Sequence, residues 1–145
     1  NGYIKSNQFT KGEELFQEMK TKKITPNILT YNNMINGYIK SNKNTKVEEM
    51  LDGMKQSGIK PDIITYTTMI NGFIKLNQIE KSEKILKEMK LNDIKLGAPT
   101  YNTMINGYIK SNQFTKGEEL FQEMKTKKIT PNILTYNNMI NGYIK

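Results

Sequence analysis

The chain has 145 residues, with 22 lysines against 14 acidic residues and a formal net charge of +8; arginine, histidine, cysteine and tryptophan are absent. The missing cysteine and histidine exclude disulfides, the usual zinc sites and nucleophile systems that need a thiol or an imidazole. No apolar run approaches the roughly 20 residues that cross a membrane. We therefore expect no enzyme activity, cofactor, metal site or membrane partner.

The first segment, residues 1–27, begins with NGYIK and continues into a pattern in which Thr10 and Glu13 have the spacing of a capping box. Such a Thr-x-x-Glu pair predicts a helix N-terminus, because each side chain accepts a backbone N–H. The segment ends near Pro26, since proline stops a helix. We interpret residues 1–27 as a partial repeat, and we expect the true N-terminus and any targeting segment to lie outside this sequence.

The next segment, TYNNMINGYIK at residues 30–40, contains Asn36-Gly37, which in isolation is a strong β-hairpin signal. Its apolar residues follow the spacing i, i+3, i+4, i+7, i+8, which is one face of a helix. A glycine inside a helix costs about 1 kcal/mol relative to alanine, so we expect a neighbouring helix to approach closely at Gly37, Gly72 and Gly107. The segment is predicted to be helical, with no hairpin.

The same block recurs at residues 65, 100 and 135, with a step of 35 residues. Between the blocks lies a second helical pattern, opened by the spacings Thr45–Glu48 and Thr115–Glu118, and then a connector. Helix, turn, helix and connector at a fixed period predict an all-α solenoid of stacked helix-turn-helix repeats. We expect roughly seven helices of about 10–14 residues and no strands. The complete repeats are predicted at 28–62, 63–97 and 98–132, with a partial repeat at 133–145.

A longer period is superimposed on the first. Residues 1–40 and 106–145 are identical, a shift of 105 residues or three repeats. A recent duplication, a designed sequence and a longer array with a three-repeat period each account for it, and the ends that split a helix favour the longer array.

The repeat TYNNMINGYIKSNKNTKVEEMLDGMKQSGIKPDI closely resembles the pentatricopeptide repeat, whose pattern runs Thr-Tyr-Asn-x-Leu-Ile-x-Gly-Tyr, then a helix ending in Met-Lys, then Gly-Ile-x-Pro-Asp. The tetratricopeptide repeat has a 34-residue period and a different signature. The resemblance implies a right-handed superhelical solenoid that binds single-stranded RNA, one base per repeat, in mitochondria or plastids.

The resemblance also implies base-selecting residues, namely the residue after Thr-Tyr and the residue after the connector proline. In this chain those positions are Asn27, Asn32, Asp62, Thr67, Gly97, Asn102, Asn132 and Asn137. Asn32 with Asp62 resembles the pair that prefers uracil, and Asn102 with Asn132 resembles the pair that prefers cytosine. Thr67 would favour a purine, but its partner Gly97 follows Leu96 instead of proline, which leaves that base open.

Two further roles come from the resemblance. The apolar residue before Thr-Tyr would wedge between bases, at Leu29, Ile64 and Leu134, and Pro99 departs from this pattern. Lys40, Lys75 and Lys110 resemble phosphate contacts. Because lysine lacks the planar fork of arginine, these lysines would act as point charges.

The residues alone indicate the same surface. Each first helix carries polar residues at i, i+4 and i+8, away from its apolar face: Asn32, Asn36, Lys40; Thr67, Asn71, Lys75; Asn102, Asn106, Lys110. Residues 30–42, 65–77 and 100–112 contain no acid, whereas acids crowd the second helices. Amides and lysines without carboxylates suit base edges and phosphates. The alternative is a solvated face enriched in asparagine and lysine by an AT-rich coding sequence.

A structural or filament-forming scaffold is the rival function. Perfect three-repeat identity suits end-to-end self-association, because identical surfaces can stack without limit. An open solenoid end would expose a core face of the type that contains Met34 and Ile35.

Overall fold

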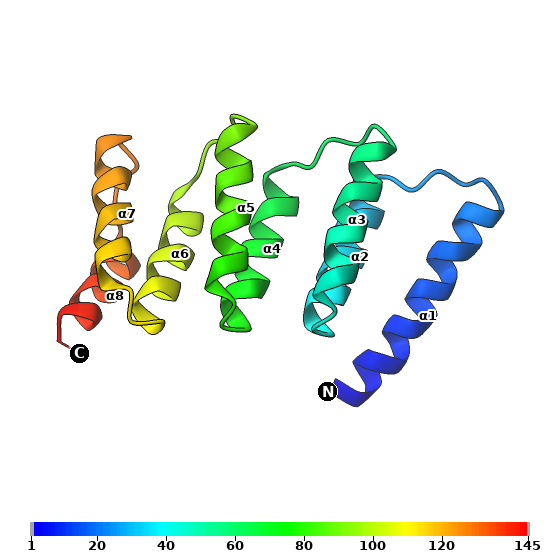
Figure 1. Ribbon diagram of the computed structural model, residues 1–145, viewed down its shortest axis with the longest axis horizontal. Coiled ribbons are helices and arrows are strands. Elements are labelled where there is room, and N and C mark those ends of the chain that lie inside the picture. Colours follow the sequence, from blue (N-terminus) through cyan, green and yellow to red (C-terminus); the bar gives the residue numbers. More distant parts are fainter. Residues whose placement is uncertain (1, 145) are drawn as a thin grey trace. The chain divides into compact units, whose positions relative to one another are not determined.

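Figure 1 shows a computed structural model of the chain, which describes the backbone of residues 2–144 and the side chains from Thr10 onward. The described residues form helices and no strands: α1 Gly2–Thr21, α2 Ile28–Lys40, α3 Asn44–Gln56, α4 Ile63–Lys75, α5 Ile79–Leu91, α6 Ala98–Lys110, α7 Phe114–Thr126 and α8 Ile133–Tyr143. The predicted all-α class is confirmed, and Asn36-Gly37 lies inside α2. Within the described residues, no helix is long and apolar enough to cross a membrane.

The chain divides into two compact units, one ending at Thr68 and one beginning at Met69, and each is described by itself. In the first unit, α2 packs against α3 and also contacts α1. In the second unit, α6 packs against α7, and α8 packs against both of them. The pair α2 and α3 and the pair α6 and α7 are therefore helical hairpins.

The core follows the helical periodicity of the sequence. The buried residues of α2 are Tyr31, Met34, Ile35, Tyr38 and Ile39, the set that the i, i+3, i+4 pattern predicts. The buried residues of α3 that face them are Val47, Leu51 and Met54. The expected close approach at glycine is confirmed at Gly107, where an added Cβ would lie 2.4 Å from Cδ1 of Ile74.

The turns inside the hairpins depend on asparagine. Asn42, Asn77 and Asn112 have φ of 57°, 59° and 61°, in the left-handed region that asparagine tolerates. The next residue then bonds back to the first helix, as Lys43 N does to the Tyr38 carbonyl at 2.9 Å. Each second helix begins directly after this turn.

The predicted capping boxes at Thr45 and Thr115 are therefore wrong. The N-caps of α3 and α7 are Lys43 and Gln113, and neither side chain makes a capping hydrogen bond. Each threonine is the second residue of its helix, because the left-handed asparagine ends the turn earlier than the Thr-x-x-Glu spacing suggests.

The first helix also differs from expectation. α1 is a single helix of 20 residues and contains Thr10 in its interior, whereas a second helix starting at Thr10 was predicted. The identical sequence at 106–126 forms the end of α6, a turn and α7. A left-handed residue costs roughly 1–2 kcal/mol. The second copy adopts the left-handed residue at Asn112, and the first copy continues as one helix through the matching position.

Candidate nucleic-acid interface

A groove of about 520 Å³ runs along the first helices of the second unit. Its lining residues are Asn71, Ile74, Lys75, Asn77, Asn102, Thr103, Asn106, Lys110, Leu134 and Asn138. They include four of the residues with implied RNA-binding roles: Lys75, Asn102, Lys110 and Leu134. No lining residue is acidic, so the groove presents amides, two ammonium groups and apolar carbon.

One implied base-selecting pair is in direct contact. Asn102 Nδ2 donates to Asn132 Oδ1 at 3.2 Å, and the Thr135 hydroxyl lies 2.5 Å from Asn102 Oδ1 and 3.1 Å from Asn132 Oδ1. Asn132 is also the N-cap of α8, because its Oδ1 accepts the Thr135 N–H at 3.1 Å. Asn102 is buried and Asn132 is exposed. The described hydrogen bonds to the Asn132 side chain all use Oδ1, and Nδ2 takes part in none of them.

The first unit contains the equivalent arrangement around Asp62. The Thr65 hydroxyl lies 2.6 Å from Asn32 Oδ1 and 3.0 Å from Asp62 Oδ1, and it shares its one hydrogen between them. Asp62 Oδ1 also accepts the Thr65 N–H at 2.9 Å. The implied uracil pair is thus joined through a buried threonine. The described bonds to the Asp62 side chain all use Oδ1, and Oδ2 takes part in none of them.

The other implied base-selecting residues form no such pair. Thr67 belongs to the first unit, and Gly97, which is the N-cap of α6, belongs to the second. Gly97 has no side chain with which to read a base or cap the helix. Asn27 caps α2 through a hydrogen bond of 3.0 Å to the Thr30 N–H, and Asn137 is exposed on α8.

The implied wedge and phosphate residues all face solvent. Leu29, Ile64 and Leu134 are 62%, 61% and 53% exposed, and Pro99 is exposed as well. Lys40, Lys75 and Lys110 are exposed at the last residues of α2, α4 and α6. A lysine there also interacts favourably with the negative end of the helix dipole.

The threonine that opens each block was missed as a site residue. Its signal was present as the spacing Asn27-x-x-Thr30, Asp62-x-x-Thr65 and Asn132-x-x-Thr135, an N-cap followed by its N3 residue. These residues form the true capping boxes of α2 and α8, and Asp62 with Thr65 makes the same reciprocal pair of bonds.

The acids of the second helices have partners outside the groove. Tyr108 donates to Glu83 at 2.7 Å, and Lys116 Nζ lies 3.1 Å from the same oxygen. Burial alone would raise the pKa of the Glu83 carboxyl, but the hydrogen bonds from Tyr108 and Lys116 and the charges of Lys116 and Lys87 outweigh it and lower the pKa. Tyr38 donates to Glu13 in the same way. Among the described residues, no cluster of three or more acids could hold a metal ion.

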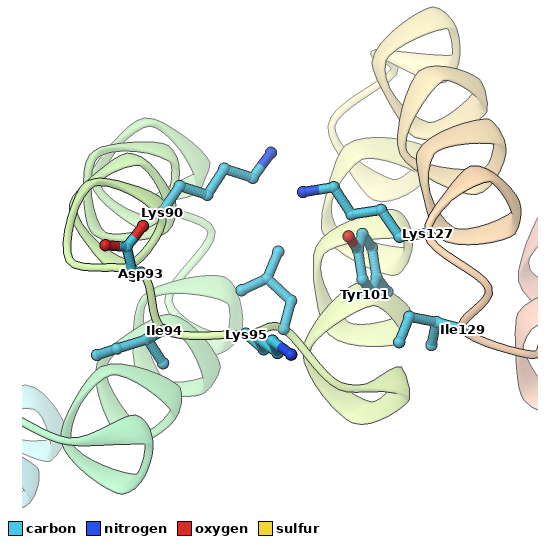
Figure 2. Close-up of a pocket in the computed structure, with 8 residues that line it drawn as sticks. Lys90, Asp93, Ile94, Lys95, Tyr101, Lys127 and Ile129 are labelled. Atoms are coloured by element: carbon cyan, nitrogen blue, oxygen red, sulfur yellow. The ribbon is translucent and has the colours of Figure 1, made fainter.

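A second pocket, of about 440 Å³, lies beside the connector between α5 and α6. Figure 2 shows the Lys90 and Lys127 side chains extending toward each other, with Tyr101 nearby. Lys90 Nζ is 3.0 Å from Glu123 Oε1, and Tyr101 donates to Glu123 Oε2 at 2.8 Å. None of the implied RNA-binding residues lines this pocket, and its Lys90 charge is already paired.

Stacked helical hairpins with a polar groove along their first helices define an α-helical repeat protein. Models of the PPR repeat family match residues 1–32, 26–75 and 96–145, and a PPR repeat model matches residues 64–94. The chain belongs to the PPR repeat family, as its resemblance to the pentatricopeptide repeat predicted. A comparison with curated protein sequences finds no match.

Solved structures of PPR proteins share this fold. PPR10 from maize matches with a TM-score of 0.87 and 30% identity over 97% of this chain and 20% of that chain. PPR10 in complex with an 18-nt psaJ RNA element matches with a TM-score of 0.78 and 30% identity over 93% and 20%. The PPR domain of Arabidopsis thaliana protein-only RNase P 1 in complex with tRNA matches in fold, with a TM-score of 0.80 and 17% identity over 94% and 70%. The chain spans about a fifth of the length of PPR10.

Proposed function

We propose that this chain binds single-stranded RNA along its first helices, reading one base per repeat without catalysing a reaction. The observation that carries the proposal is the groove of the second unit, whose lining contains amides and lysines and no carboxylate. Such a surface attracts phosphates and offers hydrogen bonds to unpaired bases. The complex of maize PPR10 with RNA supports this function for a related repeat array.

The exposed apolar residues support a stacking role. Leu29, Ile64 and Leu134 each remain more than half exposed, although the core of the repeat is formed by other residues. Protein surfaces that bind single strands commonly hold the unstacked bases against apolar or aromatic side chains. We assign these three residues to contacts with base faces, and the apolar ring of Pro99 to the same position in its repeat.

The capping residues are suited to base selection. Asp62 holds α4 through Oδ1, so Oδ2 is available to accept the N3–H of uracil. Asn132 holds α8 through Oδ1, so Nδ2 is available to donate to N3 of cytosine. The capping hydrogen bond holds each side chain in place, and the other terminal atom, Oδ2 of Asp62 or Nδ2 of Asn132, contacts the base.

A titration with salt tests the phosphate contacts. For single strands, the logarithm of the binding constant falls with that of salt concentration by about 0.7 per neutralised phosphate. We expect Lys75→Gln and Lys110→Gln each to reduce this slope by about 0.7. Fluorescence anisotropy with a labelled oligonucleotide measures it over a series of salt concentrations.

Lys84→Gln is the matched control, because Lys84 is exposed on the second helix α5 and outside the groove. It should leave the slope unchanged. If all three variants had the same slope, Lys75 and Lys110 would not contact phosphates, and their role would be to stabilise the C-terminal ends of their helices. The organellar location that the resemblance implies stays a prediction.

A further inference from the structure

A buried threonine hydroxyl lies between the two members of each base-selecting pair. Thr65 and Thr135 are both 0% exposed, so their hydroxyl groups are satisfied by the protein rather than by bulk water. Each hydroxyl oxygen accepts a backbone N–H, from Asp62 at 3.3 Å or from Asn132 at 3.1 Å. Each hydroxyl also has one hydrogen to donate.

The shorter contact of each hydroxyl is to the asparagine of the preceding repeat. Thr65 Oγ1 lies 2.6 Å from Asn32 Oδ1 and 3.0 Å from Asp62 Oδ1. The equivalent distances around Thr135 are 2.5 Å and 3.1 Å. A separation of 2.6 Å falls within the range of about 2.5–3.0 Å for O–H···O bonds and below the range of about 2.7–3.2 Å for N–H···O bonds. The amide atom that faces the hydroxyl is therefore the oxygen.

This contact decides which atom of the amide is left for a ligand. With Oδ1 bonded to the threonine, Nδ2 of Asn32 is the free terminal atom, and it carries two hydrogens to donate. In the second unit, Asn102 Nδ2 donates one hydrogen to Asn132 Oδ1 at 3.2 Å and has another to offer. Without the hydroxyl, the planar amide could turn by half a rotation and present its oxygen instead.

We propose that Thr65 and Thr135 are positioning residues for base selection: they hold the amides of Asn32 and Asn102 so that Nδ2 donates to the base. The inference rests on the proposed function, because it requires these asparagines to face RNA. Neither threonine contacts the base. In uracil, a carbonyl oxygen flanks N3–H on each side, so a base whose N3–H is accepted by Asp62 places a carbonyl oxygen toward Asn32. A donor there forms a second hydrogen bond, whereas a turned amide would bring two acceptors together.

Removal of the hydroxyl with little change in shape tests this role. Thr65→Val lacks the hydroxyl, and Thr65→Ser keeps it. Thr100→Val is the matched control: Thr100 is 3% exposed in the same block of α6, but its cap position is Gly97, which offers no side chain to join. Fluorescence anisotropy with RNAs that differ at one base gives the ratio of Kd values for each variant, and circular dichroism checks the helix content.

We expect the preference for uracil over cytosine at the base of Asn32 and Asp62 to fall in Thr65→Val from about fivefold to roughly one- to twofold, as loss of one hydrogen bond implies. Thr65→Ser and Thr100→Val should keep the ratio of the unmodified chain. The dependence of binding on salt should be the same in all variants, because no phosphate contact changes. A merely structural threonine would instead weaken binding to every RNA alike.

Thr135→Val repeats the test in the second unit. It should reduce the preference for cytosine at the base of Asn102 and Asn132 and leave the other base unaffected. If Thr65→Val loses helix content, this variant carries the test, since its pair belongs to the other compact unit.

A measurement without RNA examines the contact itself. The side-chain amide of Asn32 gives a pair of NMR signals in a ¹⁵N-labelled chain. We expect these signals to shift in Thr65→Val and to stay in place in Thr100→Val. Unshifted signals in Thr65→Val would show that the hydroxyl does not hold the amide in solution, and the inference would be wrong.

Two binding results would also overturn the inference while RNA binding stands. The first is an unmodified chain that prefers uracil together with a folded Thr65→Val that keeps the same ratio. The second is equal loss of the ratio in Thr65→Ser and Thr65→Val, which would exclude the hydroxyl as the cause. An unmodified chain that binds no RNA would refute the proposed function and this inference with it, even where the NMR signals shift.

Discussion

Asp62 and Asn132 each perform a structural task at the position where a base would be read. The carboxylate or amide oxygen of each accepts the N–H of the threonine three residues later and so caps a helix. Loss of such a cap typically costs about 1 kcal/mol. A substitution at these positions is therefore informative about RNA only if the cap survives, and the chain shows that both Asp and Asn provide it.

Asp62→Asn exploits this equivalence. The amide keeps a cap oxygen but replaces the second carboxylate oxygen with a donor, so we expect preference at the matching base to move from uracil toward cytosine. A mismatch is worth about 1–3 kcal/mol in DNA readout; at this exposed site we expect about 1 kcal/mol, or roughly fivefold in Kd. Anisotropy with RNAs that differ at one base measures the change.

The reciprocal substitution Asn132→Asp controls for a general effect of charge, and should move its own base preference toward uracil. Equal affinity for uracil and cytosine in the unmodified chain and in both variants would show that these residues do not read RNA. The scaffold function would then be the better explanation of the repeat.

The Tyr108–Glu83 contact predicts how stability depends on pH. The pKa of Glu83 is lowered in the folded chain, so its contribution is present above the unfolded pKa of about 4.3 and is lost as the pH falls through the folded value. The pKa of Tyr108 is raised, by burial, by its hydrogen bond to Glu83 and by the charges of Glu83 and Glu119, so its contribution is lost only as the pH rises above about 10.

As the pH falls, the free energy of unfolding should decrease less for Glu83→Gln than for the unmodified chain. The titrating carboxylate is gone, while a hydrogen-bond acceptor remains. Urea titrations between pH 3 and 7 give the free energy. Glu80→Gln, at an exposed position of the same helix α5, is the control and should follow the unmodified chain. A Glu83→Gln curve parallel to the unmodified one would contradict the assignment.

At the scale of one helix, glycine has two opposite roles in this chain. At Gly107, an added Cβ would lie 2.4 Å from Cδ1 of Ile74 and 3.1 Å from Cδ1 of Ile79. At Gly53, inside α3, it would have no atom within 4 Å. The first glycine permits close packing of helices, and the second only weakens its helix.

Alanine at these two positions should therefore have opposite effects. Gly53→Ala should stabilise the chain by about 0.5–1 kcal/mol, which is the usual helix preference. Gly107→Ala gains the same preference but overpacks the contact with Ile74, at a cost of about 1–3 kcal/mol, so a net loss is expected. Thermal and urea unfolding of both variants measure the difference; stabilisation by both would show that Ile74 moves aside freely.

The sequence predicted the helices well where packing repeats along the chain. The apolar spacing identified α2 and its buried face, and it correctly rejected the hairpin at Asn36-Gly37. It placed the starts of α3 and α7 too late. The left-handed Asn42 and Asn112 end the turn two residues before each helix begins, and the Thr-x-x-Glu spacing does not contain this information. The single helix α1 was not predicted, because the identical residues 106–126 form a turn, so no local pattern distinguishes the two conformations.

The candidate site was predictable in part. Its residue types and their 35-residue spacing located the groove side of the first helices, and Asn102, Lys75, Lys110 and Leu134 do line one groove. The threonine bridge between Asn32 and Asp62 was not predicted, because Thr65 belongs to the repeat that follows the one containing Asn32 and Asp62. The reading roles stay predictions until RNA binding is measured.

For the molecule as a whole, stability should depend on what covers its ends, since each repeat buries its apolar face only against neighbours. Addition of the α7 sequence, residues 111–126, after Lys145 should cover Ile140 as α3 covers Ile35. Full burial of one such side chain is worth about 1.5–3 kcal/mol, so we expect a clear rise in Tm. The same extension with aspartate at the positions of Leu120 and Met124 is the control, and an equal Tm for both would contradict the expectation.

The two conformations of one sequence have a consequence for measurement. Residues 2–21 form a single helix of about 30 Å, whereas the identical residues 107–126 turn at Asn112 between α6 and α7. One sequence thus has two end-to-end lengths in the same chain. A donor and an acceptor dye at positions 2 and 21 would make that difference visible as energy transfer, low for the extended rod and high for the folded hairpin.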